Sequence, residues 1–136
     1  MLQINAYLTF NGNCREAMTF YRDCLGGELT LQTIAESPMA DQLPAQAQEN
    51  ILHATLMKET LMLMASDMGG PGRLIHGNTI ALSLTCTNEK EIRSCYSNLS
   101  AGGQETRPLH EFFGGTIGML TDKFGLNWLL YYGQPN

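Results

Sequence analysis

The chain carries one pattern twice, and this internal repeat restricts its possible folds more than any other feature. Each copy combines an alternating apolar–polar segment, an Asn-x-x-Glu helix start, a tyrosine and a pair of glycines. The two copies are separated by roughly 75 residues, a fixed spacing that indicates two related supersecondary modules. The matching positions are Asn13, Glu16, Tyr21 and Gly26-Gly27 in the first copy and Asn88, Glu91, Tyr96 and Gly102-Gly103 in the second. We therefore expect a site where the two modules meet.

Length and charge restrict the classes of function. The 136 residues are enough for one domain that needs no disulfide or metal to fold. The net charge is −5 and no cluster of Lys and Arg is present, so nucleic acid is not an expected partner. The longest apolar run, Leu61 to Ala65, is too short to cross a membrane. The N-terminus lacks the basic and apolar regions of an export signal, so we expect a cytoplasmic protein.

The cysteine pattern favours free thiols. No C-x-x-C motif occurs, and no His spacing suits zinc. Cys24 and Cys95 fall on the apolar faces of expected helices, where a free cysteine acts as a small hydrophobic residue. A reducing compartment also disfavours disulfides. The four cysteines are Cys14, Cys24, Cys86 and Cys95.

The first copy predicts a strand, a helix and three more strands. Residues 3–10 alternate as in a strand with one buried face. Asn13 and Glu16 predict a capping box, and Gly26-Gly27 a left-handed helix end. Residues 35–50 contain two prolines and predict a long, mobile cover over a cavity. The remaining strands are expected at 28–34, 51–57 and 60–65, with a turn at Lys58-Glu59.

The second copy predicts the same order. Asn88 and Glu91 begin its helix, and Gly102-Gly103 end it. Its strands are expected at 79–86, 104–107, 115–121 and 126–132. The glycine run at residues 69–72 lacks the Lys-Ser/Thr of a phosphate-binding loop, so it reads as a linker. The sequence therefore predicts a single α+β domain of order βαβββ twice: a first module at about 1–67, a linker at about 68–78 and a second module at about 79–136.

Three sequence blocks together resemble a known superfamily. They are the run from Tyr7 to Tyr21, the short segments His53-Ala54 and Ser66-Asp67, and the run from Phe113 to Trp128. The pattern resembles the vicinal oxygen chelate superfamily of glyoxalase I, bleomycin-resistance proteins and extradiol dioxygenases, and within it the PhnB-like family. The resemblance implies two βαβββ modules that form an open, eight-stranded barrel-like sheet around a cavity. It also implies a homodimer.

The resemblance also implies where a metal would bind. Metal enzymes of this superfamily hold a divalent ion with four inward side chains, and the corresponding positions here are Asn5, Met62 or Met64, Thr79 and Leu129. Asn and Thr are weak ligands, whereas Leu and the Met thioether offer nothing useful to a hard cation. We therefore predict no cofactor. A divalent metal at other residues is the alternative.

One histidine and one aspartate form the alternative chemical site. His53 shares a strand face with Thr55 and Met57, and Asp67 follows the neighbouring strand. Such a pair can act as a general base or as half of a metal site, and the other interpretation is a structural histidine. His110 and Glu111 point to opposite faces and cannot easily share an ion. Trp128 is expected to face the helices.

The leading hypothesis is a small-molecule-binding protein without the usual metal. The expected pocket residues are Asn5, Tyr7, Thr9, His53, Met64, Thr79, Ser83 and Leu129. The alternative is a lyase, isomerase or dioxygenase-type enzyme that uses His53 and Asp67, and a third option is a dimeric assembly module. A methyltransferase is not expected, because no G-x-G-x-x-G follows a strand.

Overall fold

The chain forms two compact units, residues 1–74 and 75–136, called the N-terminal and C-terminal units below. The computed structural model describes residues 1–68 and 74–133. The division lies within the segment 68–78, and the glycine run at 69–72 lies outside the described residues. No helix in the described part of the chain combines the length and apolar character needed to cross a membrane.

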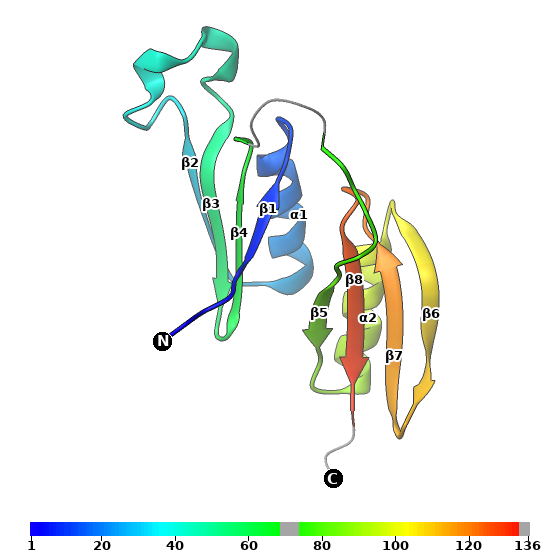
Figure 1. The fold of residues 1–136 in the computed structure, drawn as a ribbon. Helices are drawn as coiled ribbons and strands as arrows, with labels where there is room; N and C mark the ends of the chain where they lie inside the picture. Colours follow the sequence, from blue (N-terminus) through cyan, green and yellow to red (C-terminus); the bar gives the residue numbers. More distant parts are fainter. Residues whose placement is uncertain (69–73, 134–136) are drawn as a thin grey trace. The chain divides into compact units, whose positions relative to one another are not determined.

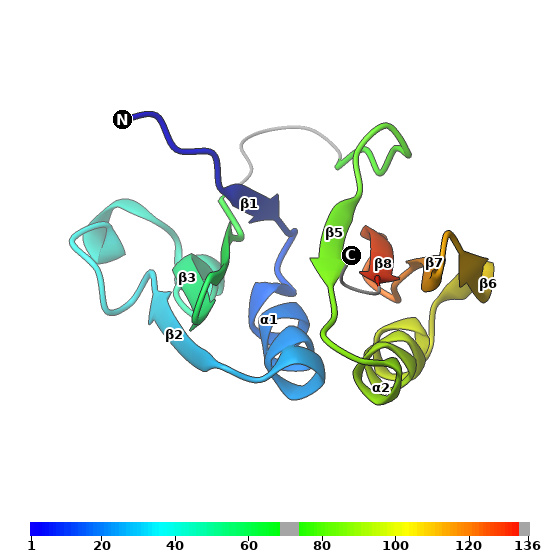
Figure 2. The ribbon, with the colours of Figure 1, turned by 90° about the horizontal axis from the view of Figure 1, so that it is seen from below.

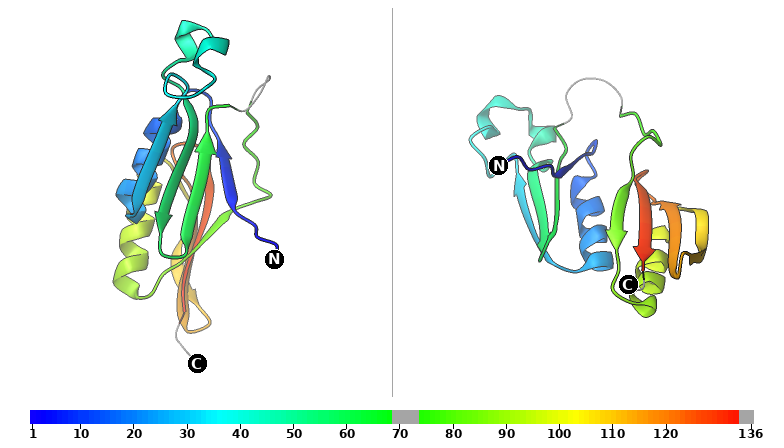
Figure 3. Two further views of the ribbon diagram at one scale, coloured as in Figure 1. Left: turned by 90° about the vertical axis from the view of Figure 1, so that its left-hand side faces the viewer. Right: turned by 60° about the horizontal axis from the view of Figure 1, so that its bottom comes forward.

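Within its described residues, 1–68 and 74, the N-terminal unit contains one α-helix and one four-stranded sheet. Strand β1 pairs in parallel with β4, and the other neighbouring strands are antiparallel. Figure 1 shows the elements, and the left view of Figure 3 shows the strands side by side in the order β2, β3, β4, β1. The elements are β1 (Ala6–Thr9), α1 (Cys14–Leu25), β2 (Glu28–Thr33), β3 (Ile51–Lys58) and β4 (Leu61–Ser66).

The C-terminal unit repeats this topology. Its strand order is β5-β8-β7-β6, with β5 parallel to β8 and the other pairs antiparallel. Two sheets and two helices in the order βαβββ, twice, confirm the predicted α+β fold. The elements are β5 (Leu82–Thr85), α2 (Glu89–Ser100), β6 (Gln104–Phe112), β7 (Gly115–Thr121) and β8 (Asn127–Tyr132).

Each helix covers one face of its own sheet (Figure 2). In the N-terminal unit Ala17, Met18 and Tyr21 of α1 are buried, as are the side chains of one sheet face: Leu8, Ala54, Leu56, Leu63 and Ala65. In the C-terminal unit Ile92, Tyr96 and Leu99 of α2 are buried together with Leu120, Trp128 and Leu130. Burial of one large apolar side chain contributes about 1.5–3 kcal/mol, so this contact fixes the strand register. The prediction that Trp128 faces the helix is confirmed.

Three strand limits differ from the prediction by more than one residue. Strands β1 and β5 are shorter, which leaves Asn5 and Thr79 outside the sheets. Strand β6 instead continues to Phe112 and passes through Pro108. It lies at the edge of its sheet, where a residue without an N–H is tolerated. The hairpin turn is shifted by one residue, because Lys58 still pairs with Leu61 and the turn lies at Glu59-Thr60.

Residues 35–50 contain local structure that the sequence does not predict. Two short 3₁₀ helices, η1 (Ala40–Gln42) and η2 (Ala45–Ala47), divide the segment. The Gln48 side-chain amide donates to the Ala40 and Leu43 carbonyls at 2.9 and 3.0 Å. At the base of the segment, hydrogen bonds from Thr33 lower the pKa of the Glu36 carboxyl. The proposed role as a mobile cover stays a prediction.

Candidate functional site

The helix-free face of the N-terminal sheet carries polar and thioether side chains. Tyr7 of β1 pairs with Met64 of β4, and Met64 pairs with Thr55 of β3. Residues directly opposite each other share a face, and so do residues two apart on a strand. His53 and Thr9 therefore lie on this face as well. We define the N-terminal open face as Tyr7, Thr9, His53, Thr55 and Met64.

Tyr7 and His53 are neighbours on this open face. Their ring centroids lie 6.2 Å apart with an interplanar angle of 31°. Tyr7 is 53% exposed, and His53, Thr55 and Met64 are partly exposed. A phenol, an imidazole and a flexible thioether can together hydrogen-bond and pack against a small organic molecule. Four predicted pocket residues, Tyr7, Thr9, His53 and Met64, are thus brought together.

Asp67 has a structural role. Its Oδ1 accepts hydrogen bonds from the backbone N–H groups of Gly12 (2.8 Å) and Cys14 (3.0 Å), and its Oδ2 accepts from Ile51 (2.8 Å). The carboxylate therefore joins the end of β4 to the start of α1 and the start of β3. It also satisfies a free N–H at the positive end of the helix.

Asp67 takes the role that the sequence assigns to Asn13. Asn13 occupies the N-cap position, but its side chain makes no capping hydrogen bond. A carboxylate placed from a distant strand replaces the local cap, which a sequence pattern cannot reveal. Among the described residues, His53 and Asp67 form no hydrogen bond or ion pair with each other, and the acid–base pair stays a prediction.

The C-terminal sheet has a matching open face. Ser83 pairs with Leu129, Leu129 with Met119, and Met119 with Arg107. One further row across the sheet joins Thr85, Tyr131, Ile117 and His110. Ser83 and Leu129, the predicted pocket residues on the strands of this unit, therefore share a face. Thr79 does not join them, because it precedes β5.

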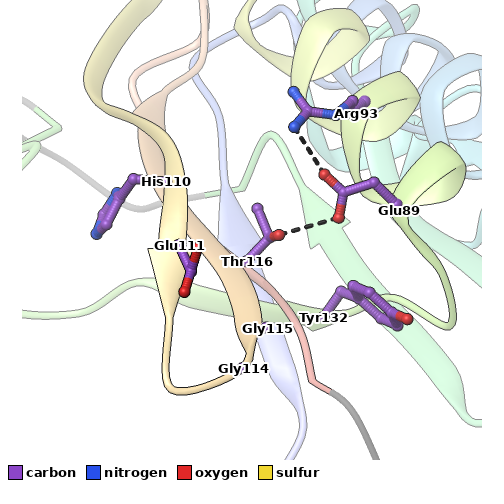
Figure 4. A pocket seen from close by; sticks show the side chains of 8 residues that line it. All are labelled: Glu89, Arg93, His110, Glu111, Gly114, Gly115, Thr116 and Tyr132. Atoms are coloured by element: carbon purple, nitrogen blue, oxygen red, sulfur yellow. Dashed lines mark hydrogen bonds and ion pairs between the residues drawn. The ribbon is translucent and has the colours of Figure 1, made fainter.

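A cavity of about 450 Å³ lies in the same unit, and His110 of the open face is among its lining residues (Figure 4). The Glu89 carboxylate is held by the Thr116 hydroxyl at 2.9 Å and by Arg93 at 2.7 Å. His110 and Glu111 lie on opposite faces of β6, as predicted, because His110 pairs with Ile117 and Glu111 with Thr116. The lining residues are Glu89, Arg93, His110, Glu111, Gly114, Gly115, Thr116 and Tyr132.

The residues at the expected metal positions do not fit a divalent ion. Asn5 and Thr79 lie outside the strands, and Met64 and Leu129 provide no oxygen or nitrogen donor. Within residues 1–68 and 74–133, no three His, Cys, Asp or Glu side chains are grouped closely enough to hold a metal ion. These positions therefore lack the full set of donor atoms that a divalent ion needs.

None of the four cysteines, all of which lie within the described residues, forms a disulfide. Cys14 and Cys86 are buried, whereas Cys24 and Cys95 are partly exposed. Burial and the negative charge of Asp67 raise the pKa of the Cys14 thiol to about 12. A hydrogen bond with Cys95, together with burial, raises the pKa of the Cys86 thiol. These raised pKa values keep both buried thiols protonated and poorly nucleophilic.

Sequence reasoning did not assign Arg107 to a face of the sheet. The predicted strand ended at this residue. The continued strand puts Arg107 and His110 on the open face beside Met119 and Ile117. The available signal was the single arginine of this strand, which lies between Glu105 and Glu111.

Known proteins match nearly the whole chain. The family model described as 3-demethylubiquinone-9 3-methyltransferase matches residues 2–131. Protein YjdN of Escherichia coli is 30% identical over 142 residues, which cover 95% of this chain and 94% of that protein. The solved structure of protein PA1353 from Pseudomonas aeruginosa is 37% identical, with a TM-score of 0.84 over 99% of this chain and all of that one.

More distant solved structures share the fold. A PhnB protein from Bacillus cereus is 23% identical, with a TM-score of 0.76 over 97% of this chain and 100% of that chain. The fosfomycin resistance protein FosX from Listeria monocytogenes is 9% identical, with a TM-score of 0.66 over 98% and 94% of the two chains. At these identities the likeness concerns the fold alone.

Proposed function

Since the chain belongs to the family described as 3-demethylubiquinone-9 3-methyltransferase, a PhnB-like family with the glyoxalase and bleomycin-resistance fold of the vicinal oxygen chelate superfamily, we propose that it binds a small organic molecule. The ligand contacts a helix-free sheet face, and the usual divalent metal takes no part. The expected pocket residues are Tyr7, Thr9, His53 and Met64 on the N-terminal open face, and Ser83 and Leu129 on the open face of the C-terminal sheet.

The observation that carries this proposal is the composition of the N-terminal open face. A sheet face that only had to be covered by apolar packing would carry aliphatic side chains, as the opposite face of this sheet does. The open face instead has Tyr7, His53 and Met64 in neighbouring positions, with the Tyr7 and His53 rings 6.2 Å apart. Few polar groups among adaptable apolar groups are typical of ligand sites.

The family description names a methyltransferase, but the fold favours another function. Dinucleotide-type cofactor sites lie at the carboxyl ends of mostly parallel, doubly wound sheets. Each sheet in the described part of the chain contains one parallel strand pair and two antiparallel pairs. We therefore do not propose methyl transfer.

Catalysis remains the second candidate function. His53 is partly exposed on the open face, where it could move a proton to or from a bound substrate. Asp67 cannot readily assist, because its oxygens already accept three backbone hydrogen bonds. A homodimer, a role as an assembly module and a cytoplasmic location stay predictions.

A thermal-shift screen tests the binding proposal. We expect at least one compound from a set of metabolites and aromatic compounds to raise the melting temperature of the wild-type protein. The substitution His53→Ala should remove most of that shift. His76→Ala is the matched control, because His76 is an exposed histidine in the C-terminal unit, beside Gly125.

A screen without any stabilising compound would contradict the proposal. An equal loss of the shift in both histidine variants would also contradict it, since a general loss of stability would then explain the result. Elemental analysis of the native protein addresses the metal: a stoichiometric divalent ion that is lost in the His53→Ala variant would favour a metal enzyme.

A further inference from the structure

The open face of the C-terminal sheet contains a small cavity with a positive rim. Its volume is about 170 Å³. Arg107 and His110 project from β6, and Ile117 and Met119 from the neighbouring strand β7. The lining residues are Arg107, His110, Phe112, Ile117, Gly118 and Met119. The cavity therefore combines one permanent cation, one imidazole and an apolar floor.

The carboxylates of this unit lie elsewhere. Glu89 binds Thr116 and Arg93, and Glu91 binds Thr87 at the start of α2. Asp122 is buried and accepts from the Trp128 indole. Glu111 is on the opposite face of β6 from His110. Gln104 pairs with Thr121 on the open face, so the next residue, Glu105, points to the helix side, where its charge raises the pKa of Tyr96. In a chain of net charge −5, a cavity rim with Arg107 and without a carboxylate is therefore a local positive site.

Arg107 is available for an anion. Among the described residues it forms no ion pair with a carboxylate, and its side chain is exposed. A guanidinium can hold a carboxylate through two parallel hydrogen bonds. The His110 Nδ1 lies 2.8 Å from the Pro108 carbonyl, which can only accept, so Nδ1 carries the hydrogen. This contact fixes the ring and leaves Nε2 for a ligand.

The cavity volume limits the size of the apolar group that the ligand can carry. An apolar cavity of about 150 Å³ accommodates one benzene ring, so about 170 Å³ suits a single ring or a branched alkyl group. Phe112 stands edge-on to Tyr131, with ring centroids 6.4 Å apart at 89°, and extends the aromatic wall. The thioether of Met119 can adapt to an irregular ligand.

We infer that this cavity binds a small carboxylic acid with one aromatic ring or a similar apolar group. Arg107 binds its carboxylate, His110 orients it, and Ile117, Met119 and Phe112 contact its apolar body. The inference names the ligand class for one of the two open faces, and it rests on the proposed small-molecule function. It also distinguishes this cavity from that of Figure 4, whose two glutamates would repel the same anion.

Titration of the full-length protein with three single-ring compounds, followed by NMR chemical-shift changes, tests the inference. The probes are phenylacetate, its neutral analogue phenylacetamide and the cation benzylammonium. We expect phenylacetate to bind about tenfold more tightly than the amide, as for a hydrogen bond to a charged group, and benzylammonium not to bind. The shifts should concentrate on residues of β6 and β7.

Two variants separate charge from packing. Arg107→Gln should weaken phenylacetate binding about tenfold and leave the amide unchanged. Arg22→Gln is the matched control, because Arg22 is also exposed but lies on α1 next to Asp23. Equal binding of the acid and the amide, or no effect of Arg107→Gln, would overturn the inference and leave the binding function intact. If other compounds stabilise the protein but phenylacetate does not bind, the inference is also overturned and the binding function is kept. Failure of every compound in the thermal-shift screen would overturn both.

Discussion

The two units have the same topology, but they hold the starts of their helices in different ways. In the C-terminal unit the cap is local: the Asn88 Oδ1 accepts from the Glu91 N–H at 2.8 Å, and the Glu91 carboxylate accepts from the Thr87 N–H at 2.9 Å. In the N-terminal unit the cap comes from Asp67, which is 53 positions away from Cys14. A capping group has to supply an oxygen to free N–H groups, and its place in the sequence is not restricted.

The ends of the two helices are held alike. Gly26 and Gly102 both have positive φ angles, of 81° and 77°. In each unit a lysine from a hairpin lies over this glycine: Lys58 in the N-terminal unit and Lys123 in the C-terminal unit. The Lys58 Nζ also donates to the Leu25 carbonyl at 3.2 Å, where a cation favours the negative helix end. The comparison shows that the repeat preserves backbone conformation and close packing, whereas the polar capping groups have diverged.

Removal of the capping side chains should give the largest difference in stability between the two units. Asp67→Ala leaves three backbone N–H groups of β3 and the α1 start without their acceptor, so we expect about 3 kcal/mol lower unfolding free energy. Asn88→Ala removes one local cap and should cost about 1 kcal/mol. Denaturant unfolding followed by circular dichroism measures both values. Equal losses in the two variants would show that the distant cap adds nothing beyond a local one.

The second glycine of each pair should be the next most sensitive position. A Cβ on Gly27 would lie 2.8 Å from the Met57 carbonyl oxygen, and one on Gly103 would overlap the Thr121 carbonyl oxygen. Since backbone atoms cannot move aside, we expect Gly27→Ala and Gly103→Ala to cost about 2–3 kcal/mol each. Gly26→Ala and Gly102→Ala should cost about 1–2 kcal/mol, because they meet only flexible lysine side chains. Thermal unfolding of the four variants checks this ranking, and a reversed order would contradict the packing argument.

The tyrosine of the second repeat, Tyr96, connects the helix of the C-terminal unit to its sheet. The Tyr96 hydroxyl lies 3.0 Å from the Arg107 carbonyl and 2.9 Å from the Met119 carbonyl, so it joins α2 to β6 and β7. Burial and the charge of Glu105 raise the pKa of this hydroxyl, which keeps it protonated as a donor. We expect Tyr96→Phe to lower stability by about 1 kcal/mol. Native-state hydrogen exchange should show reduced protection of the backbone amides of β6 and β7. Reduced protection confined to β5 would contradict the role of the Tyr96 hydroxyl.

The sequence predicts most of the fold because hydrophobic periodicity and glycine pairs are local signals. The alternation at residues 3–10 correctly predicts a strand with one buried face, on which Leu8 and Phe10 lie, because this pattern depends on neighbours within one element. Residues 35–50 were expected to be irregular, but they contain two 3₁₀ helices. The side-chain amide of Gln48 holds this segment through hydrogen bonds to the Ala40 and Leu43 carbonyls, and no local sequence pattern predicts these contacts.

The candidate site is harder to predict because it depends on groups from different strands. Alternation placed His53 and Thr55 on one face, and the pairing of Tyr7 with Met64 then completed the N-terminal open face. The role of Asp67 could not be predicted, because three backbone segments converge on it only after folding. Arg107 was not assigned, since the predicted strand ended at this residue, whereas the edge strand β6 continues through Pro108 to Phe112.

The smallest effect concerns the thiol that lies closest to the distant cap. The pKa of Cys14 rises from 9.0 to about 12 because of burial and the charge of Asp67. Between these values the unfolded chain loses the thiol proton and the native protein keeps it, so stability falls as the pH rises from about 9 to about 12. Denaturant unfolding at pH 7 and at pH 10 measures this difference, and Cys14→Ala should reduce it. Cys86→Ala should also reduce it, because burial and the hydrogen bond with Cys95 raise the pKa of the Cys86 thiol as well. A difference in stability between pH 7 and pH 10 that Cys14→Ala leaves unchanged would contradict the raised pKa of the Cys14 thiol.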